Sequence, residues 1–289
     1  MTTALTQHTI TVNGLRTQLR QGGRDLYADE AVVFVHGNPG SGQDWAALME
    51  ATAPYARGIA LDMPGFGQAD KPADYPYSVE AGASFLTDAL TQLGVRRAHL
   101  VLHDFGGPWG MTWALNNPDC YASLVLINTG VLKNYRWHYM ARIWRTPILG
   151  ELQQLLTTRW GFHKAIRHGC PRGLPDDFVN RMYDDLDQNT KRAILKLYRA
   201  TGDLAERSAA MATAFKPISR PTLVVWGAAD PYLPVHYAEQ QRDTFVQAQV
   251  AVLPDSGHFP FADNPEAVAD LVVPFLMQQL ARAPMAAAG

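Results

Sequence analysis

The sequence predicts an α/β fold in which a mostly parallel sheet carries helices on both faces and an inserted helical cap. Three observations predict it. Short apolar runs alternate with helical patterns, the chain opens on a hairpin pattern, and one long stretch without any strand pattern interrupts the alternation. The 289 residues, 47% of them hydrophobic, are enough to bury a substantial core.

The hairpin pattern consists of two short alternating segments, 9–12 and 15–19, which are separated by Asn13 and Gly14. An Asn-Gly pair favours a two-residue hairpin turn, because both turn positions require a positive φ. We therefore expect an antiparallel hairpin at one edge of the sheet.

Six continuous apolar runs come next, and runs of this kind are typical of parallel strands buried on both faces. They are residues 31–35, 58–61, 98–102, 124–127, 222–226 and 250–253. Helical patterns separate most of them, including 79–93 and 105–116. A last helix is expected from Asn264-Pro265-Glu266, because asparagine caps helices, proline fits the first turn and an acid favours the positive helix end.

The alternation stops between residues 131 and 215, where tryptophan, tyrosine and arginine accumulate in helical patterns. We expect this segment to be a helical cap on a core domain made of 1–130 and 216–289. The segment holds 14 Lys+Arg against 8 Asp+Glu, a net charge of +6, which leaves −8 on the remainder. Such a cap could attract an anionic substrate or hold the core electrostatically, although a solvated helical surface gives the same count.

Composition excludes several classes of partner. A net charge of −2 predicts no general attraction to nucleic acid or to an anionic membrane. No run of eighteen apolar residues is present, and the N-terminal residues lack the pattern of a secretory signal, so we expect a cytoplasmic protein. The expected partners are a small apolar organic substrate and water, with a homodimer left open as the assembly state.

No cofactor or metal is expected. Cys120 and Cys170 are too isolated to predict a disulfide framework or a zinc site. The nine histidines show no metal-binding spacing, and the glycine-rich segment 37–42 lacks the lysine of a phosphate loop.

The most informative motif is the apolar run 100–102 followed by His103-Asp104-Phe105-Gly106-Gly107. A strand that passes through a glycine-rich turn into a helix is typical of a nucleophile elbow, which lifts one side chain clear of the sheet. Serine is the usual occupant, but here it is Asp104. A carboxylate attacks an sp³ carbon and leaves an alkyl ester, so the motif favours opening a carbon–oxygen or carbon–halogen bond. The alternative is an aspartate that merely caps a turn.

Three further segments follow predicted strands, at the sheet edge where ligands bind in open parallel sheets. The turn 36–40 offers backbone N–H groups that, with the N–H of Phe105, could form an oxyanion hole. Asp230 and His258 each follow a later strand. The order nucleophile, acid, histidine predicts a triad in which His258 is the base and Asp230 orients it.

These segments resemble the α/β-hydrolase superfamily, in the branch that holds epoxide hydrolases and haloalkane dehalogenases. The similarity covers most of the core, while the cap matches loosely; it lies in 36–39, in 62–67 (Asp-Met-Pro-Gly-Phe-Gly), in 103–107 and at Asp230 and His258. The resemblance implies an α/β-hydrolase fold and a two-step reaction. Asp104 attacks carbon, and water activated by His258 then hydrolyses the ester.

The leaving group separates the two activities. Haloalkane dehalogenases hold the halide with a tryptophan directly after the nucleophile, but that residue here is Phe105, which has no N–H. Trp109, one helical turn later, is the candidate replacement. Asn38 resembles the halide-binding asparagine of many dehalogenases, and Leu102 stands where epoxide hydrolases usually carry glycine.

Epoxide opening instead needs a proton donor for the alkoxide, and the resemblance implies two cap tyrosines. Tyr198 matches the second in its setting, and Tyr135 or Tyr139 is the candidate for the first. Because a missing donor harms halide release directly, the sequence favours an epoxide hydrolase that forms vicinal diols. The alternatives are a haloalkane dehalogenase and a non-enzymatic small-molecule receptor on the same fold.

Overall fold

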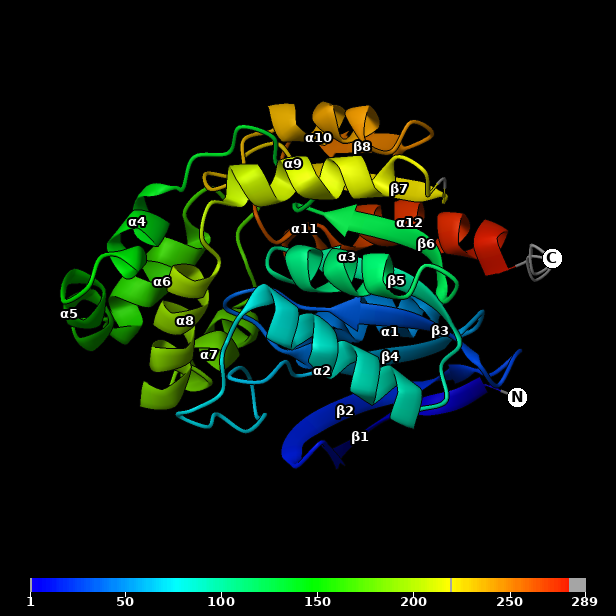
Figure 1. Cartoon of the computed structure of the whole chain (residues 1–289), viewed down its shortest axis with the longest axis horizontal. Coiled ribbons are helices and arrows are strands. Elements are labelled where there is room, and N and C mark those ends of the chain that lie inside the picture. Colours follow the sequence, from blue (N-terminus) through cyan, green and yellow to red (C-terminus); the bar gives the residue numbers. More distant parts are fainter. Residues whose placement is uncertain (1, 219, 281–289) are drawn as a thin grey trace.

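The computed structural model describes residues 2–218 and 220–280 and has the predicted fold, a single eight-stranded sheet with helices on both faces (Figure 1). The strand order is β1-β2-β4-β3-β5-β6-β7-β8, and every pair from β4 onward is parallel. Strand bounds are β1 Thr2–Val12, β2 Leu15–Arg24, β3 Glu30–Val35, β4 Arg57–Leu61, β5 Arg97–His103, β6 Tyr121–Ile127, β7 Thr222–Gly227 and β8 Gln249–Leu253.

The N-terminal hairpin forms the antiparallel edge, and β2 joins it to β4 in antiparallel register. Its turn has φ +46° at Asn13 and +82° at Gly14, as the Asn-Gly pair predicts. Both strands continue several residues beyond the alternating segments. Strand β2 continues through Gly22 and Gly23, which weaken the strand pattern in the sequence, because this part of it pairs with β1 on one side and with β4 on the other.

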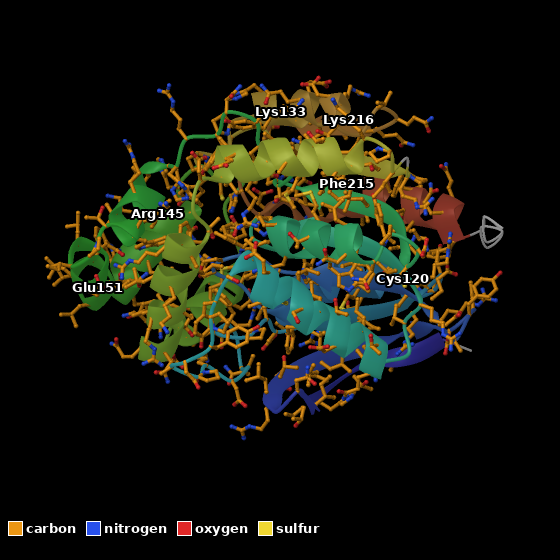
Figure 2. The ribbon with its side chains drawn as sticks, viewed as in Figure 1. Cys120, Lys133, Arg145, Glu151, Phe215 and Lys216 are labelled. Atoms are coloured by element: carbon orange, nitrogen blue, oxygen red, sulfur yellow. The ribbon has the colours of Figure 1, made fainter. Side chains whose placement is uncertain are left out.

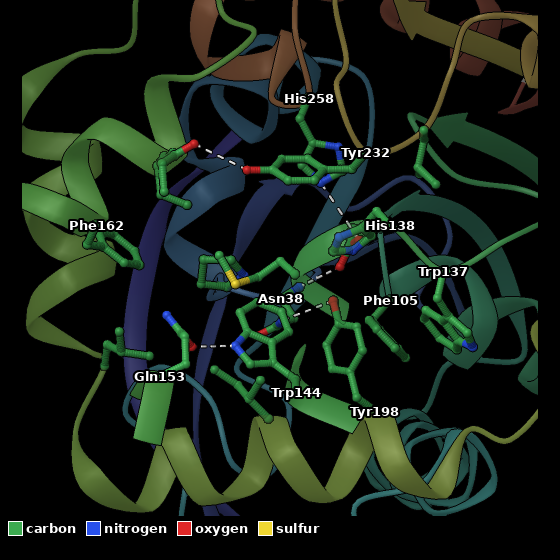
Figure 3. A pocket seen from close by; sticks show the side chains of 18 of the residues that line it. Asn38, Phe105, Trp137, His138, Trp144, Gln153, Phe162, Tyr198, Tyr232 and His258 are labelled. Carbon is green, nitrogen blue, oxygen red and sulfur yellow. Dashed lines mark hydrogen bonds and ion pairs between the residues drawn. The ribbon is translucent and has the colours of Figure 1, made fainter. Parts of the chain in front are cut away.

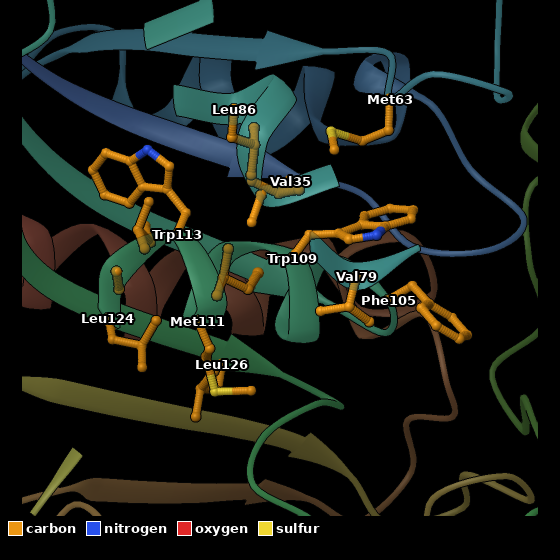
Figure 4. Packing of buried hydrophobic residues seen from close by; sticks show 14 of the residues in the cluster. Val35, Met63, Val79, Leu86, Phe105, Trp109, Met111, Trp113, Leu124 and Leu126 are labelled. Atoms are coloured by element: carbon orange, nitrogen blue, oxygen red, sulfur yellow. The ribbon is translucent and has the colours of Figure 1, made fainter. Parts of the chain in front are cut away.

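Every residue of β3, β6 and β7 is buried, which explains why these strands read as continuous apolar runs. The helices α2 and α3 pack together on one face of the sheet, and α1 packs on α12 on the other. Figure 4 shows the cluster around α3, in which Trp109 and Trp113 lie among aliphatic side chains from the strands and α2. The bounds of the core helices are α1 Ala46–Thr52, α2 Val79–Gln92, α3 Gly106–Asn116, α10 His236–Gln240, α11 Pro260–Asp263 and α12 Pro265–Leu280, with short 3₁₀ turns at Gly42–Trp45 and Gln241–Asp243.

The segment 131–215 is helical throughout its regular elements, and the structure describes no strand in it. Its helices are α4 Tyr139–Arg145, α5 Leu149–Leu155, α6 Arg159–Arg167, α7 Asp176–Asp184, α8 Gln188–Ala200 and α9 Leu204–Phe215. The first five stand beyond the carboxyl ends of the strands, whereas α9 lies beside α3 over the sheet (Figure 1). The helices that cover the carboxyl ends of the strands are therefore α4 to α8.

No helix within the described ranges is long and apolar enough to cross a bilayer. The two cysteines are both free, Cys170 buried and Cys120 partly exposed.

Candidate active site

Asp104 sits at the tip of a tight turn between β5 and α3, with φ +46°. The turn is possible because its neighbours are glycines. A Cβ on Gly106 would lie 2.2 Å from the carbonyl oxygen of Val35, and a Cβ on Gly107 would lie 2.0 Å from Oγ1 of Thr129. The Thr129 hydroxyl also donates to the Asp104 carbonyl at 2.7 Å, so the neighbouring strand end holds the turn in place.

The structure brings the three residues of the predicted triad together at the carboxyl ends of β5, β7 and β8. Figure 3 shows His258 at the cavity. Nδ1 of His258 lies 2.7 Å from Oδ2 of Asp230, and Nε2 of the same ring lies 3.7 Å from Oδ2 of Asp104. His258 is 4% exposed, so its imidazole faces Asp104 from a buried position. One ring nitrogen is thus committed to the acid, and the other is left for a water beside Asp104.

Asp230 is held by several donors. The backbone N–H groups of Tyr232 and Leu233 donate to Oδ1 at 2.8 and 3.0 Å. The Asn128 side chain donates to Oδ2 at 2.7 Å, and its own oxygen accepts the N–H of Gly227 at 2.8 Å. The sequence analysis missed Asn128, although a polar residue directly after the apolar run 124–127 was a usable signal.

The turn after β3 points its backbone at the side chain of Asp104. The N–H of Asn38 donates to Oδ1 of Asp104 at 2.7 Å, and the backbone of Phe105 hydrogen-bonds the same carboxyl group. Burial raises the pKa of Asp104 above its usual value, although these N–H groups and the His258 charge act against the rise. The backbones of Asn38 and Phe105, which the sequence suggests for an oxyanion hole, thus both hydrogen-bond the Asp104 carboxyl group.

Opposing influences also act on His258. Burial alone would lower its pKa, but the charge of Asp230, the hydrogen bond to it and the charge of Asp104 raise the pKa above the usual value. If Asp104 became an ester, its contribution would vanish and the pKa of His258 would fall. Ester formation would therefore prepare a neutral imidazole, which is the form that can accept a proton from water.

A cavity of about 290 Å³ opens above Asp104, between the strand ends and the cap (Figure 3). It reaches Asp104 and His258 at its floor, and its wall is largely aromatic, which suits an apolar ligand. The aromatic lining consists of Phe105, Tyr135, Trp137, Trp144, Phe162, Tyr198, Tyr232 and Phe259.

The candidate leaving-group donors separate into two sets. Tyr198 and Tyr135 line the cavity, whereas Tyr139 is 46% exposed and lies outside the lining. Trp109 is also outside it: the indole is buried in the core, with its ring centroid 5.7 Å from that of Phe66 and 5.9 Å from that of Phe105.

Tyr198 comes from α8 and stands over the oxyanion turn. Its hydroxyl accepts the side-chain N–H of Asn38 at 3.4 Å, and its ring packs against Phe105 at 5.0 Å between centroids (Figure 3). Within the described ranges no side chain or carbonyl accepts the hydroxyl proton itself. Burial, and then the charge of Asp104, raise the pKa of Tyr198 well above its usual value, so the phenol keeps this proton.

His138 is a cavity residue that the sequence analysis missed. Its Nδ1 accepts the N–H of Ala141 at 3.3 Å and so caps α4, which leaves the ring proton on Nε2. Burial, reinforced by the charge of His258, lowers the pKa of His138 to about 4. The ring is therefore a neutral N–H donor in the cavity. Its only signal in the sequence was its place just before a helix, which did not indicate the cavity.

No group of three or more His, Cys, Asp or Glu in the described part of the chain could hold a metal ion.

Comparison with known proteins gives a consistent picture. A family model described as alpha/beta hydrolase fold matches residues 30–265. An uncharacterized protein of Mycobacterium tuberculosis is 30% identical over 279 residues, which cover 92% of this chain and 80% of that protein. A cis-3-alkyl-4-alkyloxetan-2-one decarboxylase of Xanthomonas campestris pv. campestris is 30% identical, over 90% of this chain and 95% of that protein.

Solved structures agree with the fold. The haloalkane dehalogenase DbeA from Bradyrhizobium elkani superposes with a TM-score of 0.84 at 24% identity, over 97% of this chain and all of that one. The epoxide hydrolase CorEH superposes with a TM-score of 0.81 at 17% identity, over 95% of this chain and 99% of that one. Identities this low extend the likeness to the fold alone.

Proposed function

We propose, from the premise that the chain belongs to the α/β-hydrolase fold family, that Asp104 attacks an sp³ carbon and that the substrate is an epoxide. The backbone N–H of Asn38 donates to Oδ1 of Asp104, whereas Oδ2 lies beside His258 and is the oxygen that attacks. The attack breaks one ring C–O bond and gives a hydroxyalkyl ester of Asp104. Oδ1 becomes the ester carbonyl oxygen and stays in the oxyanion hole.

The second step cleaves the ester with water. His258 takes a proton from the water, whose oxygen attacks the carbonyl carbon of the ester, and Asp230 stabilises the imidazolium. The charge that develops on Oδ1 is met by the N–H groups of Asn38 and Phe105. Collapse of the tetrahedral intermediate breaks the ester C–O bond, and the departing alkoxide takes the proton from the His258 imidazolium to complete the vicinal diol. The carboxylic acid left at Asp104 then loses its proton, which replaces the one that the cap donor gave to the opening epoxide, so that the carboxylate and the donor are both restored.

The observation that carries the epoxide assignment is the pair of neutral donors in the cap, the hydroxyl of Tyr198 and the Nε2–H of His138. An opening epoxide develops alkoxide charge, and an alkoxide is basic enough to take a proton from a phenol whose pKa is raised. Both donors line the same cavity as Asp104. Tyr135 lines it too and is the candidate from the sequence analysis for the first cap tyrosine.

The decisive experiment traps the ester. In His258→Gln, which cannot activate water, styrene oxide should add its full mass to the peptide that contains Asp104. In the parent enzyme, repeated turnover in H₂¹⁸O should place label in the Asp104 carboxylate and yield the diol. Asp104→Ala is the control for both. If His258→Gln gives no adduct and the parent incorporates no ¹⁸O at Asp104, the covalent mechanism is refuted and a small-molecule receptor is favoured.

A haloalkane dehalogenase is the second candidate, favoured by the side-chain amide of Asn38, which lines the cavity beside Asp104. The mass of the covalent adduct distinguishes a haloalkane dehalogenase from an epoxide hydrolase. With 1-bromobutane, His258→Gln should gain a butyl group without bromine, and the parent should release bromide. Faster turnover of 1-bromobutane than of styrene oxide or cyclohexene oxide would reverse the assignment.

The decarboxylase of Xanthomonas campestris supports a third candidate, because its substrate is a strained four-membered cyclic ester. Attack of Asp104 at the alkyl-bearing ring carbon C4 would break the C–O bond and free a carboxylate on the adjacent carbon. Loss of CO₂ would then supply the electron pair for a C=C bond as the Asp104 carboxylate departs. This route consumes no water, so turnover of a cis-3,4-dialkyloxetan-2-one to alkene and CO₂ without ¹⁸O in Asp104 would identify it.

A further inference from the structure

The outer end of the cap carries a concentrated set of exposed apolar side chains, which we call the cap-tip patch. It comprises Ile148, Leu149, Leu152, Leu155, Leu156 and Trp160, each between 48% and 81% exposed. Ile148 to Leu156 belong to α5 and the residues on either side of it, and Trp160 lies in the first turn of α6. Figure 1 shows α5 at the end of the molecule opposite to β1 and the end of α12. Soluble proteins rarely leave so many large apolar side chains together at the surface unless something binds there.

The patch borders the active-site cavity. Leu149, Leu152 and Leu156 repeat at helical spacing and define the outer face of α5, whereas Gln154 is buried and lines the cavity from the inner face. Leu156 belongs to both surfaces, because it lines the cavity and is 67% exposed. The cavity therefore reaches the surface at the patch.

The segment that bears the patch is rich in positive charge. Residues 136–172 hold seven Lys+Arg and one acid, Glu151, whereas residues 173–215 hold six Lys+Arg and seven acids. The excess charge of the cap is thus concentrated in the segment that bears the patch.

Some of these charges are already neutralised. Glu151 pairs with Arg199 of α8, and Arg159 and Arg167 pair with aspartates of α7 (Figure 2 labels Glu151 and the neighbouring Arg145). Arg142 and Lys164 are exposed, and within the described ranges neither makes an ion pair.

We propose that the cap-tip patch docks onto an anionic phospholipid surface. Exposed leucine and tryptophan flanked by lysine and arginine are the composition of helices that lie in a membrane interface. The Lys164 ammonium lies 5.3 Å from the Trp160 ring, which places a cation next to the side chain best suited to the headgroup region. A second copy of the chain fits less well, because it would bring two positively charged patches together.

This proposal departs from the expectation that the net charge of −2 excludes membranes. The remainder of the chain outside 131–215 carries −8, and the core lies on the side of the cap away from the patch (Figure 1). Local charge acts over about one Debye length, roughly 8 to 10 Å at moderate salt, so the patch responds to its own surroundings. An apolar substrate dissolved in lipid could then enter the cavity beside Leu156, a consequence that rests on the proposed function.

Vesicle flotation tests the docking. The full chain should bind vesicles of phosphatidylglycerol and phosphatidylcholine at least about tenfold more tightly than vesicles of phosphatidylcholine alone. Addition of 0.5 M NaCl should weaken the binding to the anionic vesicles. Arg142→Gln/Lys164→Gln should weaken binding about 30-fold, since each cation near an anionic surface contributes a factor of roughly five. Leu155→Glu/Trp160→Glu should abolish flotation. The matched control is Val246→Glu, because Val246 is an apolar residue outside the cap that is 83% exposed. This variant should float like the parent.

Other results would overturn the proposal. Equal flotation with neutral and anionic vesicles would show that the binding does not depend on anionic lipid. Flotation of the Leu155→Glu/Trp160→Glu variant like the parent would show that the cap-tip patch is not the binding surface. A dimer by light scattering that becomes a monomer in that variant, with no flotation of the parent, would assign the patch to a subunit interface. None of these variants changes a cavity residue, so turnover of water-soluble epoxide should stay unchanged, and its failure in every protein would instead count against the proposed reaction.

Discussion

The substitution Tyr198→Phe separates the epoxide assignment from its competitors. The ring would keep its packing, because its contacts with Phe105, Trp137 and Trp144 involve the aromatic face and edge, at centroid distances of 5.0, 5.5 and 4.9 Å. Only the hydroxyl is lost, together with one long hydrogen bond from Asn38. We therefore expect a protein of near-parental melting temperature that lacks one of its two proposed proton donors.

Removing a single donor to a developing oxyanion in a buried site lowers kcat by about 10²–10³. Because the Nε2–H of His138 would remain, we expect the lower end, a loss of about 100-fold in kcat for styrene oxide, or about 2.7 kcal/mol. The Michaelis constant should change little, since the interaction strengthens as the C–O bond breaks. Turnover of 1-bromobutane should fall by less than about tenfold, because bromide leaves without a proton.

The matched control is Tyr232→Phe. Tyr232 lines the same cavity, but its hydroxyl donates to the carbonyl oxygen of Ala165 at 3.2 Å and has no role in the proposed step. It should retain kcat within about threefold, a margin comparable to one modest hydrogen bond. Equal losses in both variants, or a Tyr198→Phe enzyme that opens styrene oxide at the parental rate, would refute the role given to Tyr198.

Three further perturbations test the rest of the site. Phe105→Trp places an indole N–H beside Asp104 and should add halide affinity, seen as bromide quenching of tryptophan fluorescence that the parent lacks. The kcat/KM profile should fall on the acid side at a pH above the ordinary aspartate pKa of about 3.9, because burial raises the pKa of Asp104 and only the carboxylate attacks. Asn128→Ala strips Asp230 and the Gly227 N–H of a partner, and we expect a loss of about 1–3 kcal/mol in the free energy of unfolding by urea, together with reduced kcat.

Most of the fold could be predicted because the strands are buried on both faces. Burial of every residue in β3, β6 and β7 turns the parallel strands into continuous apolar runs, which a sequence displays directly. The sequence predicted the turn of the hairpin but not the length of its strands. The extension of β2 through Gly22 and Gly23 depends on pairing with neighbouring strands, including β4, which is distant in the sequence. The cap boundary was harder, since α9 has the same helical pattern as its neighbours and only packing beside α3 separates it from them.

The positions of Asp104, Asp230 and His258 could be predicted because each lies within five residues after the end of a strand, and parallel strands bring their carboxyl ends together. The cap donors could not, because helices α4 and α8 come from distant parts of the chain and their orientation over the cavity depends on packing. Tyr139 and His138 are adjacent in sequence, yet one is 46% exposed and the other lines the cavity. Residue type favoured the tyrosine, while the turn into α4 directs the histidine inward.

A series of hydrogen bonds away from the cavity shows that the position of a residue in the fold, more than its type, decides whether it belongs to the candidate site. Ser123 Oγ lies 2.7 Å from Nδ1 of His99, whose Nε2 lies 3.0 Å from Oε1 of Glu30, so a serine, a histidine and an acid are aligned as in a catalytic triad. All three are buried at the amino-terminal ends of their strands, and His99 precedes Asp104 by five residues on β5, roughly 16 Å.

This buried set stabilises the fold and faces none of the cavity that lies over Asp104. Burial lowers the pKa of His99, and the hydrogen bonds from His99 and Arg97 outweigh burial to lower the pKa of Glu30. Both groups therefore contribute stability at neutral pH that is lost as the pH falls through their titration ranges. Ser123→Ala should leave epoxide turnover at the parental value while lowering the urea midpoint by the equivalent of about 1–3 kcal/mol. Loss of turnover in Ser123→Ala at full stability would mean that the chemistry belongs to the serine and that Asp104 is a structural turn residue.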